Sequence, residues 1–180
     1  MEIKQIINQL IPMLVLTSQV GVVMVGGAWI MFKNKRKVLV KSLGKRAMGL
    51  ALIVAAGASL GSLFFSEVMG LVPCQLCWYQ RILMYPQVIM LGVALKQKRK
   101  YSWESVIAAS IGAMTSAYHY LLQRSAVPNY FCNAVGYSES CSNVFEMTYG
   151  YITIPLMALT AFVMIIGFNY LGWRESTRKI

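Results

Sequence analysis

Five long apolar segments dominate the chain. They lie at residues 10–32, 47–71, 78–95, 105–123 and 151–172. A helix needs about 20 apolar residues to cross the hydrocarbon core of a bilayer, and each segment approaches or exceeds that length. With 57% hydrophobic residues and a mean hydropathy of +0.56, the chain is not typical of a soluble domain. The sequence therefore predicts an all-α membrane protein with five transmembrane helices.

Basic residues are distributed unevenly among the connecting segments. Fourteen of the 17 lysines and arginines lie at 33–46, 96–100 and 174–179, which five spans would place on one side of the membrane. Because cytoplasmic loops are rich in Lys and Arg, these segments are expected to be cytoplasmic, with the N-terminus outside and the C-terminus inside. This topology accounts for the net charge of +11, so the lipid bilayer rather than a nucleic acid is the expected partner.

Four cysteines form two pairs, which this topology places on the outer face. Cys74 and Cys77 form a CxxC motif at the start of the third apolar segment, and Cys132 and Cys141 lie in the polar segment 124–150. Disulfides persist outside the cytoplasm, so both pairs can be oxidised there. Four cysteines allow three connectivities, and the sequence alone does not choose among them. Since the CxxC pair can close locally, Cys132–Cys141 is the natural second bridge.

The residues that follow Pro73 are typical of a reactive thiol pair. Pro73 suits the first position of a helix, where its missing N–H costs nothing. Cys74, Cys77 and Arg81 then follow at spacings of three and four, so they share one helix face. The helix N-terminus and the Arg81 guanidinium both favour a thiolate, and the guanidinium can also donate to a carbonyl oxygen such as that of a quinone. The alternative is that Arg81 reaches the lipid headgroups and pairs with Glu67.

Two further features of the apolar segments have open interpretations. His119, the only histidine, lies near the outer end of the fourth segment. It could handle protons when a dithiol is oxidised, and a structural role is equally compatible with its position. In the second segment, the spacing of Gly57 and Gly61 fits close helix packing.

A metal site and structural disulfides are the alternatives to redox chemistry. Four thiolates would suit zinc, but 54 residues separate Cys77 from Cys132, and the second pair is Cx8C rather than Cx2–4C. No metal site is therefore predicted. A CxxC bridge closes too small a loop to stabilise the fold much, whereas a Cys132–Cys141 bridge could be structural.

The most specific motif extends from Pro73 to Pro86 and reads PCQLCWYQRILMYP. Here the chain resembles the DsbB family of membrane thiol oxidases, and most closely its BdbC-like branch in Gram-positive bacteria. The resemblance covers roughly residues 43–172, including both cysteine pairs, His119 and the segment 152–155. It implies a four-helix transmembrane domain over 43–180 with an outer redox loop at 124–150. Residues 1–42 would add an N-terminal transmembrane helix and a basic cytoplasmic loop that the family typically lacks.

The resemblance also implies a reaction and a location, the bacterial cytoplasmic membrane. A soluble DsbA-like thioredoxin-fold protein would pass its electrons to the loop disulfide, with Cys132 forming the mixed disulfide. Cys74 would exchange with the loop pair, and Cys77 would be the thiolate that faces a membrane quinone, menaquinone or ubiquinone. Arg81 would hold a quinone oxygen, and His119 completes the candidate quinone-binding residues.

Two other classes of protein also use cysteines within a membrane. A vitamin-K-epoxide-reductase-like protein would place the loop cysteines before the CxxC motif, whereas here the CxxC motif comes first. A non-enzymatic membrane protein would use the four cysteines as metal ligands or as structural disulfides.

Overall fold

A computed structural model describes residues 42–128, 132, 140–142 and 151–177, together with six positions between residues 13 and 21. The elements formed by residues 42–177 are α3 (Ala47–Leu63), the π-helix η1 (Phe64–Val68), α4 (Gln75–Lys96), α5 (Trp103–Gln123) and α6 (Ile154–Thr177). They occupy the last four predicted apolar segments, and α6 continues beyond the predicted end at 172. Most of the first predicted segment, 10–32, lies outside the described residues.

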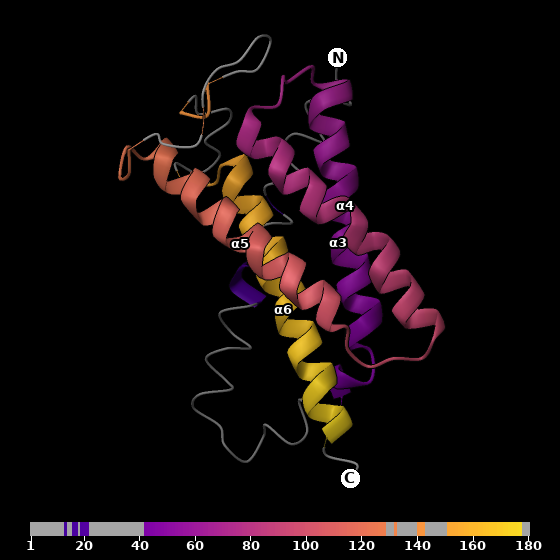
Figure 1. Cartoon of the computed structure of the whole chain (residues 1–180). Coiled ribbons are helices and arrows are strands. Elements are labelled where there is room, and N and C mark those ends of the chain that lie inside the picture. The colour runs from indigo at the N-terminus through magenta and orange to yellow at the C-terminus, as the bar shows by residue number, and fades with distance from the viewer. Residues whose placement is uncertain are drawn as a thin grey trace.

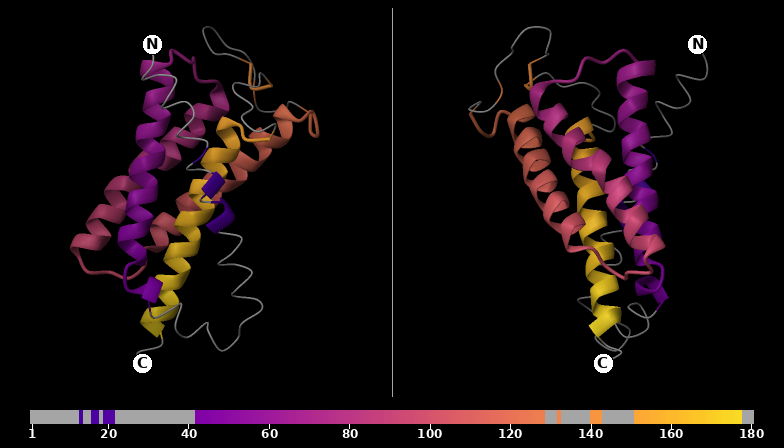
Figure 2. Two further views of the ribbon diagram at one scale, coloured as in Figure 1. Left: turned by 180° about the vertical axis from the view of Figure 1, so that it is seen from behind. Right: turned by 45° about the vertical axis from the view of Figure 1, so that its right-hand side comes forward.

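Helices α3 to α6 lie side by side along one long axis (Figures 1 and 2). Helix α5 packs against α4 and α6, and α3 packs against the same two helices. The core between them contains Leu91, Phe162 and Ile165, all completely buried. Each helix therefore has two principal neighbours, and each keeps one face on the outside of the bundle.

Polar side chains lie inside this bundle and large apolar side chains lie outside it. Gln87 on α4 and Ser105 on α5 are completely buried. The Gln87 amide donates to the Ser105 carbonyl at 3.1 Å, and the Ser105 hydroxyl donates to the Gln87 side-chain oxygen at 2.6 Å. Outside, Ile53, Ile89 and Met114 are 69%, 71% and 65% exposed. This distribution is typical of a membrane protein, because lipid solvates apolar side chains while buried polar groups must find partners within the protein.

Two of the described helical segments are long and apolar enough to cross a membrane by composition alone. They are Ala47–Val68 and Ile154–Thr177, with mean hydropathies of 2.0 and 1.9 over their most apolar windows. Helices α4 and α5 have similar lengths and carry more polar residues, several of which face the interior. The protein is thus an all-α membrane protein, as predicted.

The two ends of the bundle differ in charge and chemistry. Lys45 and Arg46 precede α3, basic residues of 96–100 join α4 to α5, and Arg174 lies near the end of α6. The start of α3, the connection from α4 to α5 and the end of α6 lie at one end of the bundle, and the start of α4 lies at the other (Figure 1). The described basic residues of these segments are therefore near the end of the bundle remote from the start of α4.

Glycines permit two close contacts of α6. A Cβ atom added at Gly172 would lie 1.8 Å from the carbonyl oxygen of Lys100. A Cβ atom added at Gly112 on α5 would lie 2.3 Å from Cζ of Phe162. Heavy atoms cannot approach this closely, so both contacts require the missing side chain.

Candidate functional site

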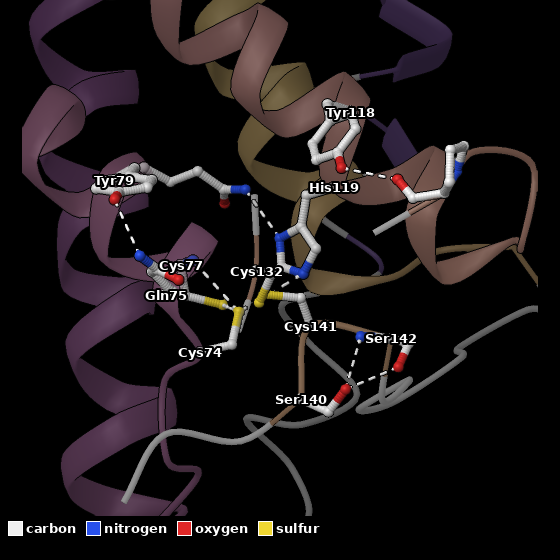
Figure 3. Close-up of a disulfide and its surroundings, with 12 residues drawn as sticks. Cys74, Gln75, Cys77, Tyr79, Tyr118, His119, Cys132, Ser140, Cys141 and Ser142 are labelled. Carbon is white, nitrogen blue, oxygen red and sulfur yellow. Dashed lines mark hydrogen bonds between the residues drawn. A yellow bond between two sulfur atoms is a disulfide. The ribbon is translucent and has the colours of Figure 1, made fainter. Parts of the chain in front are cut away.

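Cys74 and Cys77 lie at the start of helix α4 (Figure 3). Cys74 is the N-cap residue, and its Sγ atom accepts the backbone N–H of Cys77 at 3.3 Å. The prediction that Pro73 takes the first helical position is wrong, because the helix begins at Gln75 and Pro73 precedes the cap. The two cysteines are reduced, with their Sγ atoms 2.8 Å apart. The cap geometry thus directs one sulfur at the helix N-terminus, where partial positive charge stabilises a thiolate.

The sulfur of Cys74 is surrounded by hydrogen-bond donors. The Cys77 thiol and the Cys77 N–H approach it from α4, and Nε2 of His119 lies 3.6 Å away on α5. The hydrogen bond from the Cys77 thiol, aided by His119, lowers the pKa of the Cys74 thiol well below its usual range, although burial opposes this shift. These contacts favour Cys74 as the thiolate of the reduced pair, whereas the family resemblance assigned that role to Cys77.

The loop disulfide lies directly against the CxxC pair. Cys132 and Cys141 are bonded to each other, which is the pairing that the sequence favoured. The Sγ atoms of Cys74 and Cys141 and one ring nitrogen of His119 all lie within 4.8 Å of one another. Figure 3 shows the labelled cysteines converging on His119. Thiol–disulfide exchange requires a thiolate to attack a nearby disulfide sulfur, so the arrangement can move electrons between the two pairs.

The sulfur atoms are shielded from solvent. Cys74 and Cys132 are each 3% exposed, and Cys141 is 1% exposed. Leu76 and Leu122 pack around them in an apolar cluster. While Cys132 and Cys141 are bonded to each other, neither offers a thiolate to a metal.

A pocket of about 350 Å³ lies between α3, α4 and α6, next to the CxxC pair. Its walls are mainly apolar, and α4 contributes the polar side chains of Cys77, Gln80 and Arg81. Gly57 and Gly61 line it as well, and no part of α3 to α6 lies within 4 Å of a Cβ added at either, so the predicted close packing is not made with these helices. The volume and the few convergent polar groups are typical of a small-molecule site.

Arg81 lies at the wall of this pocket. Its Nε donates to the Ser62 hydroxyl at 3.0 Å, and its Nη2 donates to the Ser62 carbonyl at 3.2 Å. The guanidinium carbon lies 5.4 Å from the ring centre of Trp78. Nη1 has no hydrogen-bond partner among the described residues, so it can donate to a ligand in the pocket.

His119 lies behind the pocket rather than in its wall. It is 1% exposed and is not among the residues that line the pocket. Its Nδ1 lies 3.1 Å from the amide nitrogen of Gln80, a residue 6% exposed that does line the pocket. Sequence reasoning gave Gln80 no role, although a glutamine in an apolar helix, three residues after Cys77, is a signal for a buried polar contact.

Comparisons with known proteins agree with this site. The sequence profile of the family described as Disulfide bond formation protein DsbB matches residues 44–172. A probable disulfide formation protein of Oceanobacillus iheyensis is 42% identical over 143 residues, which cover 77% of this chain and 99% of the relative. Disulfide bond formation protein C of Bacillus subtilis is 46% identical over 118 residues, covering 64% of this chain and 84% of the relative. No solved structure matches the chain.

The lipid-facing helices and the adjacent sulfur pairs define a membrane oxidoreductase that acts in disulfide bond formation. The chain belongs to the DsbB family, as the extended motif from Pro73 to Pro86 predicted. Membership implies that the protein works with another thiol oxidoreductase.

Proposed function

We propose that the protein is a membrane thiol oxidase that reoxidises a soluble DsbA-like thioredoxin-fold protein and passes the electrons to a membrane quinone. The position of the CxxC pair carries this proposal. On one side, Cys74 Sγ lies within 4.8 Å of Cys141 Sγ. On the other side, Cys77 lines the pocket that Arg81 also lines. One dithiol therefore contacts both a second disulfide and a place where a small oxidant can bind.

Electron transfer from the partner begins at the loop disulfide. A partner thiolate attacks Cys132, so that the Cys132–Cys141 bond breaks and Cys141 leaves as a thiolate. The second partner thiol then resolves the mixed disulfide, which releases oxidised partner and leaves both loop cysteines reduced.

Transfer between the pairs needs two further exchanges. The Cys141 thiolate attacks Cys74 of an oxidised CxxC pair, and Cys77 leaves as a thiolate. The Cys132 thiolate then attacks Cys141, which restores the loop disulfide and expels Cys74 as a thiolate. Two electrons have now moved to the CxxC pair.

The residues of the pocket fit a quinone, either menaquinone or ubiquinone. A bound quinone supplies an acceptor for two electrons and two protons. Cys77 lines the pocket, and the Arg81 guanidinium is held where it can donate to a carbonyl oxygen. The mainly apolar walls contributed by α3 and α6 suit the apolar ring of a quinone.

The proposal includes an orientation in the bacterial cytoplasmic membrane. The chain would cross it five times, with the N-terminus outside, the C-terminus in the cytoplasm and both cysteine pairs on the outer face. Residues 1–42 would form the extra helix and basic loop, and residues 43–180 the four-helix domain with its outer loop. The position of the described basic residues near the end remote from the start of α4 supports this. Gln19 supports packing of the extra helix on α6, because its amide donates to the Thr160 hydroxyl at 3.1 Å.

Thiol counting without oxygen tests the proposal. The chain is fully reduced, freed of reductant and mixed with menadione or a short-chain ubiquinone analogue, and free thiols are counted by maleimide mass-tagging. We expect all four thiols to disappear in the wild type, and the three remaining thiols to persist in Cys77→Ser. Thiols that persist in both proteins would refute quinone coupling and leave metal binding or structural disulfides as the better account.

A further inference from the structure

Gln80 is a buried polar residue that takes no part in the electron transfer proposed above. It is 6% exposed, and its amide nitrogen lies 3.1 Å from Nδ1 of His119. An amide nitrogen can only donate a hydrogen bond, so Nδ1 must be the acceptor. The ring proton of a neutral His119 then belongs on Nε2, the nitrogen that lies 3.6 Å from the Cys74 sulfur.

We propose that Gln80 is a positioning residue that holds His119 in the tautomer whose Nε2–H donates to the Cys74 sulfur. Gln80, His119 and Cys74 form a relay from α4 to α5 and back to the cap of α4. This inference rests on the proposed function, because the hydrogen bond to Cys74 acts in the second exchange between the cysteine pairs. In that step the Cys132 thiolate attacks Cys141, the Cys74–Cys141 bond breaks, and Cys74 leaves with the electron pair. A donor already aimed at Cys74 stabilises the departing thiolate and speeds this step.

The surroundings of Cys74 leave few other groups to play this part. The titratable groups that act on it are Cys77 on α4 and His119 on α5. Arg81 acts on Cys77 instead, and the neighbouring Cys132–Cys141 disulfide does not titrate. Among the described residues, α3, η1 and α6 add no charged group to this set. The tautomer of His119 therefore decides whether α5 presents a donor or a lone pair to Cys74, in addition to the Cys77 thiol and N–H on α4.

The chain offers a matched control on the same helix. Gln87 is also a fully buried glutamine of α4, two turns further along, where it is bonded to Ser105 and is remote from the cysteines. Gln80→Met and Gln87→Met each remove one buried amide at nearly constant volume. Only the first should change the chemistry of Cys74.

The experiment measures the alkylation rate of Cys74 against pH in the full-length protein with the CxxC pair reduced and the Cys132–Cys141 disulfide intact, by iodoacetamide labelling and peptide mass spectrometry. We expect Gln80→Met to slow labelling of Cys74 at pH 6–7 by about tenfold or more, with the difference closing at high pH where any cysteine ionises. Gln87→Met should follow the wild type. His119→Ala should reproduce the loss, and adding Gln80→Met to it should cause little further loss, because Gln80 acts only through the ring.

Two results would overturn the relay. One is a Cys74 profile in Gln80→Met that matches the wild type. The other is full additivity of Gln80→Met and His119→Ala. A variant that is merely destabilised would lose thermal stability without moving the pH dependence of labelling. Because labelling needs neither quinone nor partner, failure here refutes the relay alone, whereas failure of the thiol-counting experiment refutes quinone coupling and leaves the relay intact.

Discussion

Arg81 on α4 is bound to Ser62 on α3 and not to Glu67, the partner that the sequence suggested. Both the hydroxyl and the carbonyl of Ser62 accept from the guanidinium, at 3.0 Å and 3.2 Å. The Glu67 carboxylate accepts from the Ser66 hydroxyl instead. The arginine is therefore fixed beside the pocket by neutral groups, which leaves its charge available to a ligand.

Removal of the guanidinium should weaken the use of quinone. We expect Arg81→Ala to raise the quinone KM of anaerobic thiol oxidation by about tenfold or more, because a charge-assisted hydrogen bond to a carbonyl is lost. Ser62→Ala should give a smaller increase, since it only loosens the arginine. Arg124→Ala is the control, an arginine that lies over the Tyr120 ring and outside the pocket lining. An unchanged quinone dependence in Arg81→Ala would contradict the assignment of Arg81 to the quinone.

Cys74 should be reactive at mildly acidic pH. Its lowered pKa of about 5 means that the thiolate persists above that pH and is lost only as the pH falls through it. An ordinary cysteine ionises near pH 8.5. With the CxxC pair reduced and the loop disulfide intact, the labelling rate of Cys74 is limited by its 3% exposure, but it should already reach its plateau at pH 6–7. Half-maximal labelling of Cys74 near pH 8.5 would show that the donors around its sulfur do not favour the thiolate.

A single loop substitution should trap the contact between the pairs. In Cys132→Ser, Cys141 has no partner in the loop and lies beside Cys74. We expect mild oxidation to yield a Cys74–Cys141 disulfide, identified by peptide mapping under non-reducing conditions. The reciprocal variant Cys141→Ser should give much less of a Cys74–Cys132 bond. Equal yields of the two crosslinks would mean that Cys141 is no better placed than Cys132 to bond to Cys74.

The basic end of the bundle should be sensitive to one methyl group. Gly172→Ala should lower the free energy of unfolding by about 1–3 kcal/mol, because the new Cβ collides with the Lys100 carbonyl and forces α6 away. This displacement would also disturb the ion pair between Lys100 and Glu175. Gly167→Ala is the control, since nothing lies within 4 Å of its added Cβ. Thermal unfolding in detergent should therefore distinguish the two variants, and equal midpoints would argue against the close contact.

Sequence reasoning succeeded where the signal was local. Hydropathy located α3 to α6, because lipid exposure requires apolar residues along each whole helix. The Cys132–Cys141 pairing was predictable because a CxxC pair can close locally, which leaves the other two cysteines to bond to each other. Contacts between helices were not predictable in this way. The Gln80–His119 and Arg81–Ser62 contacts depend on which faces of α3, α4 and α5 meet, and no spacing within one helix encodes that.

The contact between Gly112 and Phe162 makes the shape of the pocket depend on a residue that does not line it. The Phe162 ring rests against the bare backbone of α5 and also forms part of the pocket wall. A bulkier residue at 112 would push the ring away from α5 and take room from the pocket. The room that the pocket leaves for the proposed quinone therefore depends on residue 112, which does not itself line the pocket.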